Sequence, residues 1–183
     1  MSLDDLRVRS AERLLITALD TLRSEPRSIL TTSLGRGQLA FEFSERFPAA
    51  TVRCWFLDLY PADETRDLLA EQGSEIEVVC AADLPDAECD LVAIPCSRGG
   101  ESELTRDLLQ QGFQRLSNGG TLLAAVDNPK DTWLHHEVEK LQKGLTRIPS
   151  RWGVAYRLVK KSPLKRVRDF SCEFAFRDGD NLV

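Results

Sequence analysis

The sequence is poor in the residues that build metal centres, disulfide frameworks and membrane spans. It has only two histidines, the neighbours His135 and His136, and five cysteines, an odd number without a Cys-x-x-Cys pair. Adjacent histidines on a helix point in different directions, so we expect no metal site. No apolar run reaches the roughly 18 residues of a membrane span, and the N-terminus, with Asp4, Asp5 and Arg7, lacks the apolar core of a signal peptide. We therefore expect a cytoplasmic protein with reduced, mostly buried thiols and no membrane partner.

Length and composition predict a single domain with one sizeable core. The chain has 183 residues, of which 42% are hydrophobic, with 8 prolines and 11 glycines. Apolar runs alternate with segments of helical periodicity. Strands are predicted near residues 28–32, 52–57, 75–80, 90–94 and 121–126, and helices near 10–22, 38–46, 61–69, 102–116 and 131–141. This alternation predicts a doubly wound α/β fold.

The C-terminal region departs from this alternation. Residues 153–159 and 170–176 have strand composition, and a basic loop joins them without an intervening helix. We therefore expect an antiparallel hairpin at one edge of an otherwise parallel sheet.

Charge is distributed unevenly along the chain. Residues 140–183 hold 11 Lys and Arg against 4 Asp and Glu, whereas residues 1–139 hold 13 against 25. The densest basic stretch contains Lys160, Lys161, Lys165, Arg166 and Arg168. Such density can neutralise phosphates and predicts an RNA-binding surface. An equally weighted alternative is an exposed edge whose lysines prevent aggregation.

A glycine pair follows the first predicted strand. Gly35 and Gly37 precede a predicted helix, and Asp58 ends the next apolar run. Glycines let the backbone approach a ligand, and free amides at a helix start favour negative charge. Asp58 would then accept hydrogen bonds from ribose hydroxyls. The acidic residue that usually stands just before such glycines is missing, since residues 32–34 read Thr-Ser-Leu. A turn into a packed helix is the structural alternative for the glycines.

The order of these features resembles class I S-adenosylmethionine-dependent methyltransferases. The resemblance is carried by Gly35-Arg36-Gly37, Asp58, Asp83, Asp90-Leu91-Val92 and Asn118-Gly119-Gly120. It implies a Rossmann-like fold with a mostly parallel twisted sheet, helices on both faces and a C-terminal hairpin. It also implies that Gly35 and Gly37 bind the methionine part of the cofactor, Asp58 the ribose and Asp83 the adenine amine.

The segment after the fourth predicted strand lacks the catalytic signature of amino-directed enzymes of this superfamily. Those enzymes carry Asn/Asp-Pro-Pro-Phe/Tyr there, whereas residues 94–98 read Ile-Pro-Cys-Ser-Arg. The Pro-Cys pair resembles RNA 5-methylcytosine methyltransferases, which makes Cys96 a candidate nucleophile. An active S-adenosylmethionine-dependent enzyme on RNA or a small molecule is therefore one alternative function. An NAD-binding oxidoreductase module is another, because Gly35-x-Gly37-x-x-Ala40 followed by Asp58 also fits a dinucleotide fingerprint.

A longer resemblance spans nearly the whole chain. Residues 125–134, 156–161 and 169–178 are similar to the N-terminal half of the ribosomal RNA small-subunit methyltransferase C type. Members of that family are guanine-N2 methyltransferases built from two methyltransferase-like halves, of which the first is degenerate. The resemblance implies that residues 1–183 form a single methyltransferase-like domain, the N-terminal part of a longer two-domain protein. Its implied partners are ribosomal RNA and a C-terminal catalytic methyltransferase domain, and its implied role is noncatalytic support in rRNA processing.

Overall fold

Five parallel strands and an antiparallel hairpin form the central sheet. The computed structural model describes residues 8–170, 177–178 and 181–182. The strands of the sheet are β1 (Ser28–Thr32), β2 (Thr51–Phe56), β3 (Glu77–Cys80), β4 (Cys89–Cys96), β5 (Leu116–Val126), β6 (Thr146–Ser150) and β7 (Gly153–Val159). Their order is β3-β2-β1-β4-β5-β7-β6, with β7 antiparallel to both β5 and β6. The predicted mostly parallel α/β sheet is confirmed.

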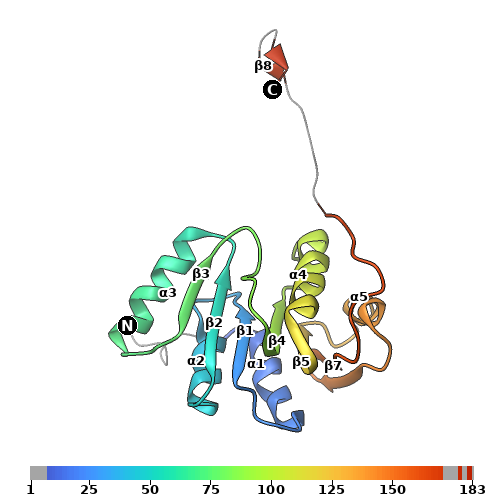
Figure 1. The fold of residues 1–183 in the computed structure, drawn as a ribbon, viewed down its shortest axis with the longest axis horizontal. Coiled ribbons are helices and arrows are strands. Elements are labelled where there is room, and N and C mark those ends of the chain that lie inside the picture. Colours follow the sequence, from blue (N-terminus) through green and yellow to red (C-terminus); the bar gives the residue numbers. More distant parts are fainter. Residues whose placement is uncertain (1–7, 171–176, 179–180, 183) are drawn as a thin grey trace.

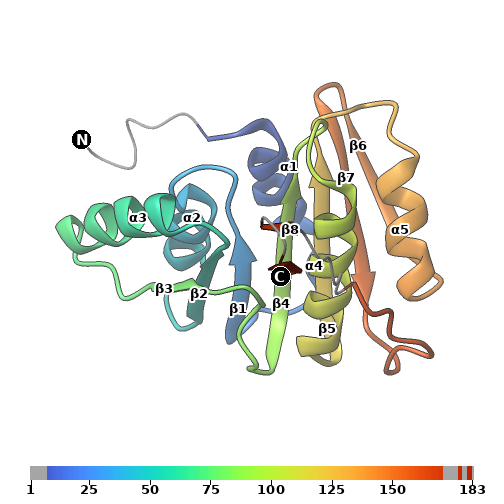
Figure 2. The same cartoon turned by 90° about the horizontal axis from the view of Figure 1, so that it is seen from above.

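Helices cover both faces of this sheet (Figure 1). They are α1 (Ser10–Ala18), extended by the 3-10 turn η2 (Leu19–Thr21), α2 (Gln38–Arg46), α3 (Leu59–Glu71), α4 (Ser102–Arg115) and α5 (Trp133–Leu141). The first three helices pack on one face, and α4 and α5 pack on the other. Figure 2 shows α4 in front of β4 and β5. None of the helices in the described ranges is long and apolar enough to cross a membrane.

The side chains of β4 point alternately to the two faces of the sheet, and the core has one layer on each face. Leu91 and Ala93 belong to the cluster under α1 and α2, whereas Val92 and Ile94 belong to the cluster under α4 and α5. Successive side chains of a strand point to opposite faces. A parallel strand covered on both faces therefore reads as a continuous apolar run, which explains why the sequence marks β4 so clearly.

The predicted hairpin is present, but its second strand was wrongly assigned. β7 pairs with β5 on one side and with β6 on the other, so neither side is open to another strand. The expected partner at 170–176 falls almost entirely outside the described residues. β6 escaped prediction because it is a short, largely exposed edge strand that contains Arg147 and Pro149, and proline is tolerated only at such an edge. A separate two-stranded pair joins β8 (Arg177–Asp178) to β9 (Asn181–Leu182).

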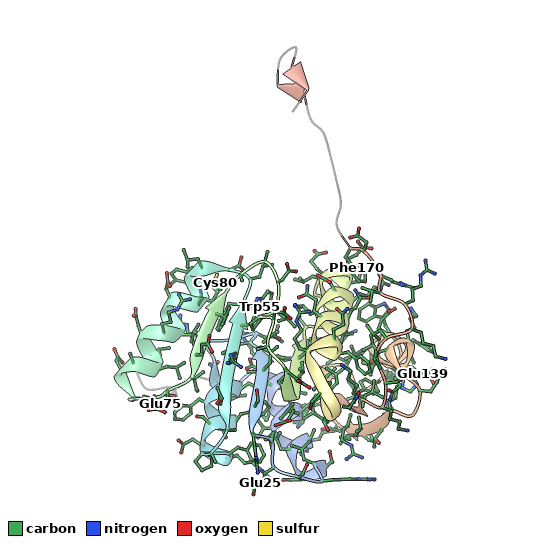
Figure 3. All side chains as sticks on the ribbon, viewed as in Figure 1. Glu25, Trp55, Glu75, Cys80, Glu139 and Phe170 are labelled. Atoms are coloured by element: carbon green, nitrogen blue, oxygen red, sulfur yellow. The ribbon has the colours of Figure 1, made fainter. Side chains whose placement is uncertain are left out.

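The chain after β7 runs along α5 and α4 as an irregular strap, defined as residues 161–170 (Figure 1). Gln110 of α4 fixes it through two hydrogen bonds to Arg168. The Arg168 amide donates to Gln110 Oε1 at 2.7 Å, and Gln110 Nε2 donates to the Arg168 carbonyl at 2.8 Å. Phe170 lies beside the same helix (Figure 3). The basic segment is thus held against the α4 face of the domain.

The sheet reverses its strand order between β1 and β4, since β1 pairs with β2 on one side and with β4 on the other. In open α/β sheets, ligands bind outside the carboxyl ends of the strands at such a switch point. The connection between β3 and β4 contains no helix. On the side of the sheet where α4 packs, β2 is therefore covered by Leu84 of this connection and by the side chain of its own residue Trp55. Figure 3 shows Trp55 on that face, close to the carboxyl edge.

Candidate functional site

A cavity of about 320 Å³ lies at the switch point. Its walls come from the carboxyl ends of β1, β2 and β4 and from the first turns of α4. Three of the predicted site residues, Gly35, Asp58 and Cys96, line it together. The remaining walls are largely apolar and include Ile94 and Leu104. The topology therefore brings the glycine loop and the acid after β2 to one place, as a nucleotide site of this fold requires.

A second hollow of about 900 Å³ adjoins the first on the side of α1. Its lining includes Arg9, Arg36 and Asp127. Gly35 and Ser97 line both spaces, so the glycine loop and the turn after β4 separate them. The loop thus forms a partition between two open regions at the carboxyl edge of the sheet.

The acidic residue missing before the glycines is supplied by another element. Glu12 of α1 is fully buried, and its Oε1 accepts hydrogen bonds from Ser33 Oγ at 2.8 Å and from the Leu34 amide at 3.0 Å. Its Oε2 faces the Arg9 amide at 3.4 Å in a capping box. Sequence reasoning did not single out Glu12. The signal was its place three residues after the helix N-cap, which predicts a capping role but not a contact with a distant loop.

Each backbone amide of the glycine loop from Leu34 to Gly37 donates a hydrogen bond to a side chain of the protein. The Leu34 amide donates to Glu12, the Gly35 and Gly37 amides donate to Ser33 Oγ at 3.0 and 3.2 Å, and the Arg36 amide donates to Gln38 Oε1 at 2.6 Å. Because Ser33 also donates its own proton to Glu12, all three hydrogen-bonding capacities of its hydroxyl are used. A loop of this kind usually offers free amides to an anion. Here those amides are already paired.

Close contacts within the loop surround both glycines and constrain Gly37 most strictly. A Cβ on Gly35 would lie 2.4 Å from Gln38 Oε1, and one on Gly37 would lie 2.6 Å from Thr65 Cγ2. Gly37 also has a φ of +78°, in the left-handed region that favours glycine. Arg36, between them, turns away to α3, where its Nε lies 2.9 Å from Glu64 Oε2. Both glycines therefore serve packing and backbone geometry, whatever ligand the cavity takes.

The two predicted acids lie in different surroundings. Asp58 begins α3 and is exposed at the cavity, and its carboxylate has no hydrogen bond or ion pair within the described part of the chain. Asp83 is not part of the cavity lining. Its Oδ1 accepts a hydrogen bond from Gln111 Nε2 at 2.8 Å, and its carbonyl accepts one from Trp55 Nε1 at 2.9 Å. Of the two predicted acids, only Asp58 lies at the cavity, where Glu101 at the start of α4 is a second exposed carboxylate.

The candidate nucleophile Cys96 is a buried, protonated thiol. Burial, reinforced by the charge of Asp131, raises its pKa to about 12. A nucleophilic cysteine needs the opposite shift, since the thiolate is the reactive form. Burial also raises the pKa of Cys89 to about 12 and that of Cys54 further. These thiols are free and buried, as expected from their apolar runs. Among the described residues, no cluster of His, Cys, Asp and Glu is placed to hold a metal ion.

Lys160 does not belong to the predicted RNA-binding surface. Its side chain is buried, and its Nζ donates to the carbonyls of Gln114 at 3.0 Å and Leu116 at 2.5 Å. The ammonium also lies 5.5 Å from the centre of the Phe113 ring, and burial lowers its pKa. Such a lysine is a structural tie between β7 and the end of α4. The other four predicted residues, Lys161, Lys165, Arg166 and Arg168, are all exposed on the strap.

Comparison with solved structures places the chain among methyltransferase folds. The 16S rRNA methyltransferase RsmC of T. thermophilus, solved with AdoMet and guanosine, matches with a TM-score of 0.72 at 18% identity, over 86% of this chain. A ribosomal protein L11 methylase from Lactobacillus delbrueckii subsp. bulgaricus matches with a TM-score of 0.69 at 14% identity, over 86% of this chain and 81% of its own. A putative rRNA methylase from Clostridium thermocellum matches with a TM-score of 0.66 at 13% identity, over 86% of this chain and 99% of its own.

At these identities the comparison shows the fold alone, which is the Rossmann-like methyltransferase fold. This chain spans 44% of the length of the T. thermophilus protein. No protein-family model and no curated protein matches the sequence.

Proposed function

We propose that this chain is a noncatalytic methyltransferase-like domain of a ribosomal RNA (guanine-N2) methyltransferase, which supports a C-terminal catalytic domain and helps to bind RNA. The observation that carries the proposal is the closed glycine loop, whose four amides from Leu34 to Gly37 are all paired with side chains of the protein. The two-domain organisation is supported by the 44% coverage of the T. thermophilus rRNA methyltransferase, a protein more than twice as long as the matched region.

The turn after β4 supports the same role. Methyl transfer to an exocyclic amine needs acceptors that hold the NH₂ group and a ring that stacks on the base. Residues 94–98 offer an aliphatic side chain, a proline, a buried thiol, a serine and an arginine. The Arg98 amide donates to Asp127 Oδ1 at 3.0 Å. Burial raises the pKa of Cys96 to about 12, so this turn supplies no ready thiolate. The Ser97 hydroxyl is its one polar side chain in the cavity lining, and the turn has no aromatic ring to stack on a base.

The residues present fit only part of S-adenosylmethionine. Asp58 is suited to accept from the ribose hydroxyls, and the apolar walls suit the base. The methionine carboxylate, in contrast, would need loop amides that Glu12, Ser33 and Gln38 already occupy. When bound, the cofactor supplies an electrophilic methyl group. In this chain the Leu34–Gly37 loop offers it no free donor for positioning.

Calorimetric titration of the purified chain with S-adenosylmethionine and S-adenosylhomocysteine tests the noncatalytic role. The closed loop predicts no saturable binding below about 0.1 mM for either ligand, a weak affinity worth no more than about 5.5 kcal/mol. Micromolar binding of either ligand would contradict the closed loop and would favour an active enzyme.

An active S-adenosylmethionine-dependent methyltransferase is the second candidate. It is favoured by one observation, the unpaired carboxylate of Asp58 at a cavity of ligand size. It predicts methyl transfer to RNA or a small molecule that disappears in Asp58→Ala and Gly37→Val. Transfer that survives both substitutions would place the cofactor elsewhere. The NAD-binding alternative gains no support from the compared structures, all of which are methyltransferases.

The proposed RNA contact rests on the strap. Lys161, Lys165, Arg166 and Arg168 are exposed, and within the described residues none of the four forms a salt bridge. Reversing all four charges to Glu should weaken binding of a short single-stranded RNA and lower the slope of log K against log salt by about 3, at about 0.7 per phosphate contact. The matched control reverses four exposed basic residues outside the strap that form no salt bridge within the described residues, Arg13, Arg23, Arg27 and Lys130. Equal losses in both variants would indicate a general charge effect and would contradict an RNA-binding strap.

A further inference from the structure

We infer that the turn between β6 and β7 stacks an unpaired nucleobase of RNA on Trp152 and contacts the neighbouring phosphate through Arg151. This inference rests on the proposed RNA binding and deepens it, because it adds a base contact to the ionic contacts of the strap. It is carried by the exposure of Trp152, by the way the turn is held, and by the distribution of charge around the sheet.

Trp152 presents a large exposed ring beside a cation. It is one of three tryptophans in the chain, and 59% of its surface is exposed. The guanidinium carbon of Arg151 lies 4.6 Å from the centre of its ring, a cation–π distance. Arg151 is also exposed and forms no salt bridge within the described residues. Proteins that bind single-stranded nucleic acids use this combination, an aromatic ring on which a base stacks and an arginine beside it.

The turn that carries this pair is held firmly on the sheet. Ser150 pairs with Gly153 across the hairpin, so the turn consists of Arg151 and Trp152 alone. Gly153 packs so closely on the end of β5 that a Cβ there would lie 2.2 Å from the Val126 carbonyl oxygen. The Trp152 amide donates to Ser150 Oγ at 3.3 Å. The aromatic ring therefore extends from a fixed backbone, and a tryptophan with only two rotatable side-chain bonds loses little conformational freedom when a base stacks on it.

Turn geometry does not account for a tryptophan at this place. Two-residue hairpin turns usually carry Gly, Asn or Asp, because those residues adopt the backbone angles of the commonest turns. Packing does not account for it either, since most of the Trp152 surface is exposed. A ligand that covers the ring would remove this apolar area from water.

Charge around the sheet favours a polyanion at this edge. The β6–β7 hairpin forms one edge of the sheet (Figure 2), and residues 144–159 contain three arginines and no Asp or Glu. At the other edge, beside β3, residues 58–71 contain five acids against Arg66 alone. RNA is attracted to the first edge and repelled by the second. Tyr60, 72% exposed on the acidic side with its hydroxyl bonded to Glu64, is therefore a matched control for an exposed ring.

The second exposed tryptophan, Trp133, lacks the free cation. It exposes 37% of its surface, and Arg106 lies 5.4 Å from the centre of its ring. The Nε of Arg106 also lies 3.4 Å from Oε2 of the buried Glu137, so its charge is already engaged within the protein. The stacking site is therefore assigned to Trp152.

The turn and the strap lie at opposite ends of β7. The strand begins at Gly153 and ends at Val159, just before the strap. At about 3.3 Å per residue, the two contacts are roughly 20 Å apart. One single strand can contact both only if it extends along the hairpin, so the probe must be several nucleotides long.

Fluorescence anisotropy of a labelled single-stranded RNA of about 12 nucleotides, titrated with the full chain, tests the inference. Trp152→Ala should weaken binding about tenfold, the loss expected for one stacked base. The slope of log K against log salt should not change in this variant, because stacking releases no counterions. Arg151→Gln should instead reduce the magnitude of that slope by about 0.7, the value for one phosphate contact with a single strand.

Two further variants separate the stacking ring from general effects. Trp152→Phe keeps an aromatic ring and should bind within about threefold of the parent chain. Tyr60→Ala removes an exposed ring in acidic surroundings and should bind within about twofold of the parent chain. An equal loss in Tyr60→Ala and Trp152→Ala would overturn the site, as would a Trp152→Ala chain that binds RNA like the parent.

The failures of this inference and of the proposed RNA role are distinguishable. Loss of RNA affinity on charge reversal of the strap, together with unchanged affinity in Trp152→Ala, would overturn the stacking site and leave the RNA role in place. No binding of the single strand by the parent chain up to about 0.1 mM would overturn both.

The same RNA annealed to its complement tests whether the base must be unpaired. A duplex keeps the phosphates but stacks its bases on one another, so they are not free to stack on a side chain. We expect Trp152→Ala to leave the duplex affinity unchanged, and a tenfold loss with the duplex as well would overturn the base contact. A parent chain that self-associates, a Trp152→Ala chain that does not, and equal RNA affinity in the two would assign the turn to a protein contact and would also overturn the inference.

Discussion

Removing the Glu12 carboxylate should destabilise the domain more than most single substitutions in a helix do. Glu12→Ala deletes the acceptor for Ser33 Oγ and for the Leu34 amide, at 2.8 and 3.0 Å, inside a region where Glu12 itself is fully buried. Each hydrogen bond to a charged group contributes about 1.5–3 kcal/mol. The Ser33 hydroxyl would also lose the partner that orients it toward the Gly35 and Gly37 amides. We expect a loss of about 3 kcal/mol in the free energy of unfolding.

Urea denaturation followed by tryptophan fluorescence measures this loss. A change of about 3 kcal/mol corresponds to a fall of roughly 6–12 °C in Tm for a chain of this size. Glu12→Gln keeps an acceptor oxygen for the same donors, so its loss should be no more than about 1 kcal/mol, the usual worth of a neutral hydrogen bond. Glu42→Ala on the exposed side of α2 is the matched control and should change stability by less than about 0.5 kcal/mol.

The ordering of the variants is the decisive result. If Glu12→Ala lost less than about 1 kcal/mol, the carboxylate would not be holding the loop, because a buried acceptor with two good donors cannot be removed at so small a cost. If Glu12→Gln and Glu12→Ala were equally destabilised, the negative charge rather than the acceptor geometry would be the source of the stability. Either result would refute the role given to Glu12 here.

Three further predictions concern single contacts. Lys160→Ala should lower the free energy of unfolding by about 2–3 kcal/mol, because it leaves the Gln114 and Leu116 carbonyls without their charged donor. RNA affinity should stay within error of that of the parent protein. A large loss of RNA affinity in a folded Lys160→Ala protein would show that Lys160 contacts RNA. Gly37→Ala should cost about 1–3 kcal/mol because of its φ of +78° and the 2.6 Å approach to Thr65, and unchanged stability in urea would refute that strain. Stability should also fall in alkaline solution: Cys89 and Cys96 have ordinary pKa values near 9 that burial raises to about 12, so the unfolded chain releases protons that the native chain retains. Their contribution is therefore complete below about pH 9 and decreases above it by up to about 1.4 kcal/mol per pH unit for each thiol; an unfolding free energy that does not change between pH 8.5 and 10 would contradict their burial.

Periodicity and turn residues predicted the parallel part of the sheet well. β1, β2 and β4 are continuous apolar runs, because helices cover both of their faces. The edge of the sheet was predicted less well. β6 is exposed on its outer side and carries Arg147 and Pro149, so it lacks the apolar alternation that identifies a strand. Residues 170–176 have strand composition and were therefore predicted as the hairpin partner of β7, a place that β6 takes.

The candidate site shows the same division between local and long-range information. Gly35, Gly37 and Asp58 could be located from the sequence, because each follows a recognisable strand. The contact of Glu12 with Ser33, 21 residues away, could not, since it depends on how α1 packs against the end of β1. Lys160 was misplaced for a related reason. A basic cluster predicts a surface, but one lysine in it follows a buried strand and binds the carbonyls at the end of α4.

The side chains of Glu12, Ser33 and Gln38 explain how the glycine loop can be stable without a ligand. Four successive amides precede α2, and an amide that is shielded from water without an acceptor costs about 1–3 kcal/mol. In a ligand-dependent loop an anion supplies the acceptors, and such a loop is weakened whenever the anion leaves. Glu12, Ser33 and Gln38 supply the acceptors internally, so the loop keeps one conformation in the free chain. Asp58 is under no comparable constraint, because its carboxylate is exposed and has no partner within the described part of the chain. A closed loop and an exposed carboxylate at Asp58 are therefore compatible in one stable fold.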